Sequence, residues 1–151
     1  MIVALFDPMK GSGPELTRFD FDRELDVIGV PTCAVSPDGT RLAISRGPES
    51  PIEIHTLHGQ LIYKIPSQSA GELFDLSWSA DQKGFFVTRT VSGANERLHL
   101  DFQGNVTSLR KCGGGTGGLG GGCGGLPSPD GRHLAIIDRD QSNNMWMMEN
   151  F

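Results

Sequence analysis

Short apolar runs recur along the whole chain of 151 residues, and several of them alternate with polar residues. The alternation has period two in 52–57 and again in 98–102, which is typical of strands with one buried face. Two further apolar runs, 61–65 and 106–109, follow these segments after turns that contain glycine. No stretch shows a convincing apolar stripe at the 3.6-residue spacing of a helix. The pattern therefore predicts an all-β chain.

One short sequence motif occurs three times, each time between two apolar runs. Its members are Ser36, Pro37, Asp38 and Gly39; Ser79, Asp81 and Gly84; and Ser128, Pro129, Asp130 and Gly131. Proline presets φ for a turn, aspartate accepts hydrogen bonds from backbone N–H groups ahead of it, and glycine adopts positive φ at no steric cost. Each copy predicts a β-hairpin. The middle copy lacks the proline and has its glycine at Gly84, so we expect its loop to differ by one residue.

The three serines are spaced by 43 and 49 positions. Four strands in a unit of about 40 to 45 residues describe the blade of a β-propeller. The sequence thus predicts a partial β-propeller of about three four-stranded antiparallel blades in residues 14–151, after an N-terminal segment, 1–13, that it leaves poorly defined. Two units are complete, over roughly 23–65 and 66–109, and a partial unit lies at each end, with strands expected near 16–21 and 145–148.

The hairpins, with the pattern Ser-Pro-Asp-Gly-x-x-Leu-Ala, resemble the WD-related propeller repeats of TolB-like proteins, over about residues 14–151. The ending, 142–151, is similar to the last strand of propellers found behind bacterial serine/threonine kinases and winged-helix regulators. This resemblance implies a non-catalytic surface for sensing or protein interaction. It implies a fold but no particular chemistry.

The number of blades is low, because propellers close their ring with about 4 to 8 blades. About three blades leave open strand edges at both ends of the stack. Three interpretations follow: a fragment of a longer propeller protein whose remaining blades cover these edges, a ring completed by self-association of copies, or a short open stack. We favour the fragment.

Composition narrows the classes of partner and compartment. Charged residues make up 21% of the chain and the net charge is −5, which argues against electrostatic binding of nucleic acid. No run of about 18 apolar residues exists, so no membrane span is expected.

An odd number of cysteines, three, does not suggest a disulfide framework. We therefore expect the cytoplasm, with the periplasm as the alternative if the chain belongs to a larger exported protein. A bond between Cys112 and Cys123 would need an oxidising compartment.

Ten of the thirteen residues in 113–125 are glycine. Glycine loses the most backbone freedom on ordering and offers no side chain to pack, so we expect a mobile loop that weakens the last blade. A phosphate-binding loop is not expected, because no helix is predicted after it and the Gly-Lys-Ser/Thr sequence of a P-loop is absent.

Four other patterns imitate functional motifs. They are the calcium-loop spacing from Asp138 to Glu149, the kinase-like Asp101-Phe102-Gln103, the pair His55 and His58, and the trio Cys112, Cys123 and His133. The first lacks flanking helices, and the second is expected to be a strand end with a turn. The histidines are expected on the surface or at a blade edge, and the trio lacks the spacing of a zinc site. No catalytic, cofactor-binding or metal-binding residue is predicted.

Two functions remain at this point. The first is a non-catalytic propeller segment that serves as a protein-interaction or sensing scaffold in a larger bacterial signalling protein. The alternative is the gating propeller of a prolyl-oligopeptidase-like serine peptidase, whose catalytic domain would lie outside this chain, since no Gly-x-Ser-x-Gly nucleophile elbow is present.

Overall fold

The structure is a computed structural model that describes residues 2–4, 9–11, 13, 15–18, 31–47, 50–66, 72–91, 94–112 and 123–137. These residues form twelve β-strands and no helix, which confirms the all-β prediction. Within the same residues, therefore, no helix exists that is long and apolar enough to cross a membrane. The strand expected at 145–148 and the calcium-like spacing after Asp138 lie outside the described residues.

The first complete sheet, the first blade, is an antiparallel meander. Its strands are β3 (Thr32–Val35), β4 (Arg41–Ser45), β5 (Ile52–Thr56) and β6 (Leu61–Ile65), paired in that order. The two middle strands are buried along almost their whole length, whereas four of the five residues of β6 are exposed. The outer strand β6 thus forms the rim of the blade.

The second blade has the same order and longer strands. They are β7 (Glu72–Trp78), β8 (Gly84–Val91), β9 (Ala94–Asp101) and β10 (Val106–Cys112), again antiparallel neighbours in sequence order. Aromatic and β-branched residues are frequent in β7 and β8, which suits a half-buried pleated surface. β9 ends at Asp101, and Phe102 and Gln103 form the following turn, so the kinase-like tripeptide is a strand end, as predicted.

A two-stranded hairpin lies on either side of the two blades. β1 (Ile2–Ala4) pairs with β2 (Glu15–Arg18), and β11 (Gly125–Pro127) pairs with β12 (Leu134–Ile136). Part of the segment 1–13, which the sequence leaves undefined, is therefore strand. The expected loop over 113–125 is corrected at its end, because Gly125 begins β11; residues 113–122 lie outside the described part. Within the described residues the molecule is a partial β-propeller.

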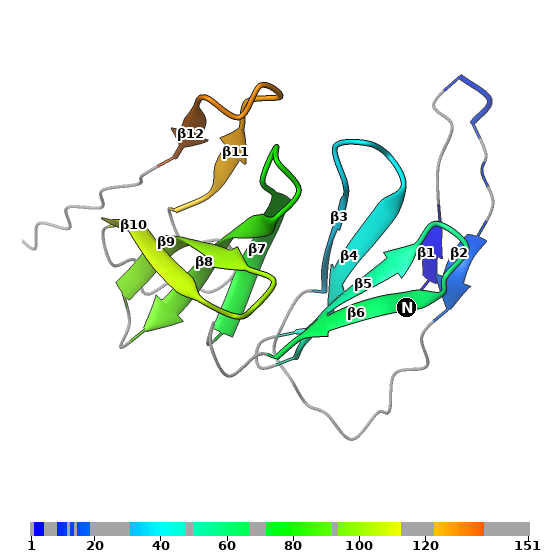
Figure 1. Ribbon diagram of the computed structural model, residues 1–151, viewed down its shortest axis with the longest axis horizontal. Coiled ribbons are helices and arrows are strands. Elements are labelled where there is room, and N and C mark those ends of the chain that lie inside the picture. Colours follow the sequence, from blue (N-terminus) through cyan, green and yellow to red (C-terminus); the bar gives the residue numbers. More distant parts are fainter. Residues whose placement is uncertain are drawn as a thin grey trace, which may run out of the picture.

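The two blades share one apolar core. Their sheets stand side by side, and the innermost strands β3 and β7 are neighbours (Figure 1). The core residues, all at most 6% exposed, are Ala43, Ile52, Ile54, Ile65, Leu73, Leu76, Trp78, Phe85, Val87, Leu98 and Leu100. Full burial of a valine, leucine, isoleucine or phenylalanine side chain contributes about 1.5–3 kcal/mol. The contact between the first and second blades is thus hydrophobic.

An aromatic cluster closes this core at one side. The ring of Phe102 lies 6.1 Å from the ring of Tyr63 in the first blade, and 5.8 Å from Phe85 and 6.1 Å from Trp78 in the second. The Tyr63 hydroxyl donates a hydrogen bond of 3.1 Å to the Phe102 carbonyl. Aromatic residues from both blades therefore hold the sheets against each other.

The opposite face of the second blade is polar. In β9, Leu98 and Leu100 point into the shared core, while Arg97 lies on the other face beside polar residues of β7 and β8. The hairpin β11–β12 lies on that side of the second blade (Figure 1). The two faces of one sheet thus make two chemically different contacts, and the polar one belongs to the sites described next.

Candidate functional site

Three hairpin turns with the same hydrogen bonds lie along one edge of the molecule. In the first, the Ser36 hydroxyl donates to the Asp38 carboxylate at 2.6 Å and accepts from the Arg41 N–H at 2.9 Å. The Asp38 carboxylate also accepts from the Thr40 N–H at 3.0 Å, and the Gly39 N–H donates to the Ser36 carbonyl at 2.8 Å. Serine and aspartate side chains thus bind backbone groups that the turn would otherwise leave unpaired.

The other two turns repeat these bonds. The serine-to-aspartate distance is 2.6 Å at Ser79 and 2.5 Å at Ser128, and the aspartate accepts the second following N–H at 3.1 Å in both. The serine hydroxyl accepts the fifth following N–H at 3.1 Å and 3.0 Å. The three turns therefore have the same length, and the expectation that the middle loop differs by one residue is wrong.

The middle turn keeps its length because Gln82 takes the conformation that glycine takes elsewhere. Its φ is 59°, against 70° at Gly39 and at Gly131, and it is the one non-glycine residue with positive φ in the described residues. Gly84, which the sequence assigned to the turn motif, instead begins β8. The Gln82 side chain accepts a hydrogen bond from the Arg41 guanidinium of the first blade. The residue that strains the turn therefore also links two neighbouring turns.

The turn carboxylates are held in their ionised form. The hydroxyl of Ser36, and then the N–H of Thr40, lower the pKa of Asp38 to about 2. The pKa values of Asp81 and Asp130 are lowered too, first by the hydrogen bonds from their serines. Carboxylates stabilised in this way are poor proton donors and acceptors near neutral pH, so their arrangement suits structure better than acid–base catalysis.

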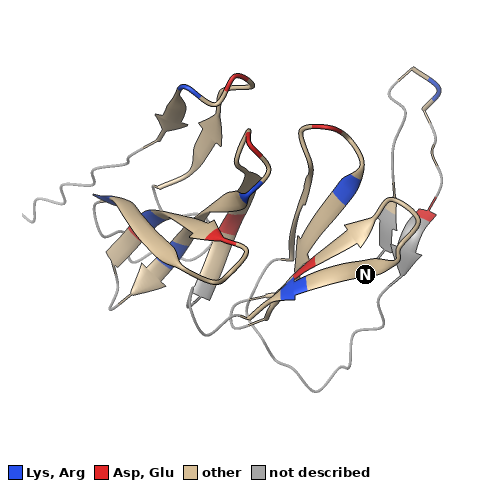
Figure 2. Ribbon diagram, in the orientation of Figure 1, with Lys and Arg blue, Asp and Glu red and all other residues tan. Residues whose placement is uncertain are grey.

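Contacts between neighbouring turns make them one surface, which we call the turn face and define as residues 36–41, 79–84 and 128–133. The Arg41 guanidinium lies 4.9 Å from the ring centre of Trp78, whose indole N–H donates to the Ala34 carbonyl at 2.9 Å. On the other side, Gly131 lies so close to Ala80 that an added Cβ would stand 2.9 Å from the alanine methyl. Each tip carries an acidic residue (Figure 2).

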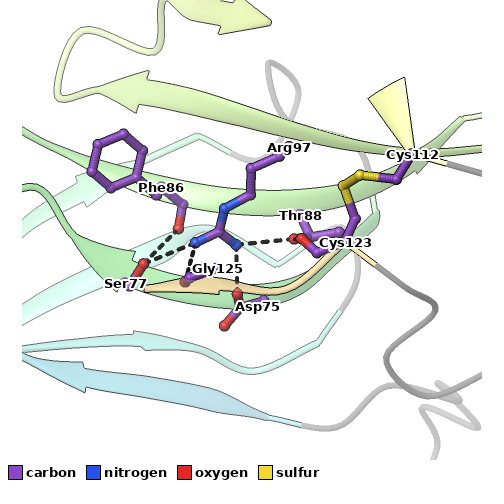
Figure 3. Close-up of polar contacts among 8 residues, drawn as sticks. All are labelled: Asp75, Ser77, Phe86, Thr88, Arg97, Cys112, Cys123 and Gly125. Carbon is purple, nitrogen blue, oxygen red and sulfur yellow. Dashed lines mark hydrogen bonds and ion pairs between the residues drawn. A yellow bond between two sulfur atoms is a disulfide. The ribbon is translucent and has the colours of Figure 1, made fainter. Parts of the chain in front are cut away.

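A second site, the Arg97 joint, connects the second blade to β11 (Figure 3). The Arg97 side chain is fully buried, and one terminal nitrogen donates to Asp75 at 2.5 Å and to the Thr88 hydroxyl at 2.9 Å. The other donates to the Ser77 hydroxyl at 3.0 Å and to the Gly125 carbonyl at 2.7 Å. The guanidinium, carried by β9, therefore bonds the two neighbouring strands β7 and β8 of its own blade and the first strand of the next hairpin. Its Nε has no hydrogen-bond partner.

A disulfide lies beside this joint. Cys112, the last residue of β10, is bonded to Cys123, and their Cα atoms are 5.7 Å apart. The Cys123 carbonyl accepts a hydrogen bond of 2.8 Å from the Thr88 hydroxyl. The trio considered for zinc is therefore not assembled, because the two sulfur atoms are bonded to each other and His133 is exposed in the third turn. Cys33 is free and exposed.

A charge cluster surrounds the buried carboxylate of Glu53 on β5. The Glu53 carboxylate accepts from Arg46 at 2.7 Å and Lys64 at 2.8 Å, and it lies 3.2 Å from Nε2 of His55. Burial raises the pKa of Glu53, but the bonds from Lys64, His55 and Arg46 together lower it to about 2. His55 is only 5% exposed and lies on β5, which has a strand on either side, so its predicted place on the surface or at a blade edge is wrong, whereas His58 is exposed in the next turn.

These sites lack the constellation of a metal centre. Among the described residues, no group of three or more histidine, cysteine, aspartate or glutamate side chains is placed to hold a metal ion.

The sequence motifs did not indicate the Arg97 joint. The available signal was that polar residues occupy one face of β7, β8 and β9, at Ser77, Thr88 and Arg97, while apolar residues occupy the other.

Comparison with known proteins identifies the fold. The structure is similar to the crystal structure of TolB from Acinetobacter baumannii, with a TM-score of 0.59 and 23% sequence identity. The match covers 92% of this chain and 32% of the TolB chain, so this chain spans about a third of the length of that protein. The similarity shows a TolB-like propeller fold and agrees with the partial propeller seen here.

The sequence matches no family model, and the search of curated proteins found no match.

Proposed function

We propose that this chain is part of a non-catalytic β-propeller that binds a protein partner through the turn face. The observation that carries the proposal is the threefold repetition of one bonded turn, with neighbouring turns in contact. Rigid loops presented side by side from a sheet scaffold are a common form of binding surface. The TolB-like fold supports a scaffold but identifies no ligand.

The exposed groups of the turn face suit a protein surface. Pro37, Lys83, Pro129 and Arg132 are exposed there, beside the three turn aspartates. The aspartates already accept hydrogen bonds within the turns, so the exposed lysine and arginine are the charged side chains most available to a partner. As cations they would pair with carboxylates of the partner. A surface with both signs of charge, on a chain of net charge −5, does not favour nucleic acid.

The disulfide supports a proposal for the compartment. Disulfides persist in oxidising compartments and are rare in the cytosol. Of the two compartments that the sequence leaves open, the bond between Cys112 and Cys123 favours the periplasm over the cytoplasm. We therefore propose that the chain belongs to an exported protein.

The chain spans about a third of the similar TolB structure, and we propose that further blades complete its ring. An attached kinase or winged-helix region remains part of the signalling hypothesis, and an attached hydrolase domain would support the peptidase alternative. The full reading frame of the gene separates the two: a sequence for an α/β-hydrolase domain with a nucleophile elbow would exclude the non-catalytic proposal.

The binding proposal is tested with a matched pair of variants. The intact chain captures its partner from the extract of the source cells, and the identified partner is then purified and titrated. The double variant Lys83→Glu and Arg132→Glu should weaken binding by about tenfold or more, because the two exposed positive charges of the turn face are reversed. Thr107→Glu, exposed on β10, should leave the dissociation constant unchanged. Equal weakening by both variants, or none by the first, would place binding elsewhere.

A further inference from the structure

Side chains of the second blade donate hydrogen bonds to two backbone carbonyls in and beside the hairpin β11–β12. Gly125 accepts from Arg97 at 2.7 Å, and the Cys123 carbonyl, two residues before, accepts from the Thr88 hydroxyl at 2.8 Å. On the hairpin itself, Leu126 is 73% exposed. Since burial of apolar surface is the main stabilising term in folding, a contact of this kind is weak compared with the apolar core between the two blades.

A covalent bond reinforces this weak contact. The disulfide joins the end of β10 in the second blade to Cys123, whose side chain is fully buried. The ten residues between the two cysteines include eight glycines. Closing such a loop in the unfolded chain removes many conformations, so the crosslink favours the closed arrangement by a factor on the order of 100.

We propose that the bond between Cys112 and Cys123 is a redox-controlled clasp: its reduction releases the hairpin β11–β12 from the second blade, while the two four-stranded blades stay folded. The blades share an apolar core to which neither cysteine belongs. Among the described residues, the hairpin is held by the disulfide, by two hydrogen bonds from Thr88 and Arg97, and by the contact of Gly131 with Ala80. Loss of the covalent bond therefore acts on the hairpin alone.

The reaction is exchange with a dithiol. One thiolate of the reductant attacks the sulfur of Cys112, the less deeply buried of the two, and the bond to Cys123 breaks. The Cys123 thiolate takes a proton. The second thiol of the reductant then attacks the mixed disulfide, so that Cys112 leaves as a thiol and the reductant as a cyclic disulfide. Two electrons and two protons pass to the protein.

Release would change the turn face, a consequence that rests on the proposed function. The third turn, 128–133, connects β11 to β12, and Gly131 contacts Ala80 of the middle turn. When the hairpin detaches from the second blade, this turn no longer lies beside the other two turns of the turn face. A partner that binds all three turns then loses part of its binding surface. Binding would then depend on the redox poise of the compartment.

Hydrogen exchange of the full chain tests the clasp without any partner. The experiment uses Cys33→Ser, which removes the free exposed thiol, and compares the oxidised chain with the chain reduced by a dithiol, alkylation giving the thiol count. On reduction, amide exchange of β11 and β12 should rise on the order of 100-fold. Amides of β8 and β9 should change by less than about twofold, because the core between the blades is intact.

A second variant keeps the test informative if reduction is slow. In the oxidised chain, Thr88→Val removes the hydroxyl that binds the Cys123 carbonyl, and exchange of β11 should rise several-fold while β9 stays protected. Unchanged exchange of β11 in the fully reduced chain would overturn the proposal. An equal rise in β8, β9 and β11 would overturn it too, because the disulfide would then stabilise the whole fold. Neither result would bear on binding by the oxidised turn face.

Discussion

Gln82 shows how one residue can serve two purposes in a turn. It holds the left-handed backbone conformation with φ of 59°, which costs a residue other than glycine about 1–2 kcal/mol. Glycine at the same place, as in the other two turns, would avoid that cost but would leave the Arg41 guanidinium without its amide acceptor. The sequence thus gives up local stability for a link between two blades.

The first prediction concerns this position. Gln82→Val should lower the free energy of unfolding by about 2 kcal/mol, because a β-branched side chain fits the left-handed region worst. Gln82→Gly should change it by less than about 1 kcal/mol, since relief of strain offsets the lost bond to Arg41. Urea denaturation measures both, with the exposed neighbour Lys83→Ala as the control. Equal effects of valine and glycine would show that the backbone conformation is unimportant.

The second prediction concerns the charge cluster at Glu53. The folded pKa, about 2, lies below the ordinary value of 4.5, so its stabilisation is complete above pH 4.5 and is lost as the pH falls toward 2. Glu53→Gln should remove this share, on the order of 3 kcal/mol at neutral pH. Its unfolding free energy should then fall less steeply with acid than that of the native chain. The turn aspartates, whose pKa values are also lowered, are present in both proteins and contribute equally to the dependence of their stability on pH. An identical fall of stability with acid in the two proteins would therefore contradict the contribution assigned to Glu53.

At the scale of elements, the entry into β8 depends on a close approach. A Cβ on Gly84 would stand 2.5 Å from the Leu100 carbonyl oxygen and 2.8 Å from the His99 ring. The first of these neighbours is backbone of the adjacent strand β9, which cannot move without breaking the pairing of Gly84 with Asp101. The glycine is therefore required by the sheet and not by the turn.

The third prediction follows from this contact. Gly84→Ala should lower the free energy of unfolding by about 2–3 kcal/mol through overpacking. Gly124→Ala is the matched control, because a Cβ there meets nothing within 4 Å, and it should change stability by less than about 0.5 kcal/mol. Thermal unfolding followed by circular dichroism compares them. A Gly84→Ala chain as stable as the control would mean that β8 and β9 are separated further than the structure shows.

The sequence predicted the elements better than their contacts. Alternating runs and the repeated turn indicated the hairpins, because these signals are local. The positive φ of Gln82 was missed, since glycine at position 84 suggested a shifted loop. The buried places of His55 and Arg97 were missed as well, because they depend on partners distant in the sequence: Arg97 bonds Asp75 and Gly125. Conformation within a turn and burial of a charge are decided by packing that the pattern alone does not contain.

At the scale of the whole molecule, the two blades are complete, but apolar side chains on the flanking strands are exposed to solvent. Between them lies a shared apolar core, but Leu126 and Ile137 at the hairpin β11–β12 are 73% and 70% exposed. Leu61, Ile62 and Tyr63 are about half exposed on the outer strand β6. Exposed apolar side chains on edge strands favour pairing with another chain. A ring with further blades, or another copy of this chain, would cover them.

The central claim is that this chain is an incomplete propeller, and its mass in solution tests that claim most directly. Sedimentation velocity of the oxidised 151-residue chain, from micromolar to millimolar concentration, reports the number of chains in each particle. We predict association that increases with concentration, because open edges and exposed apolar residues find partners. The longer propeller with all its blades should stay monomeric under the same conditions. A well-folded monomer of the 151-residue chain at every concentration would contradict the account.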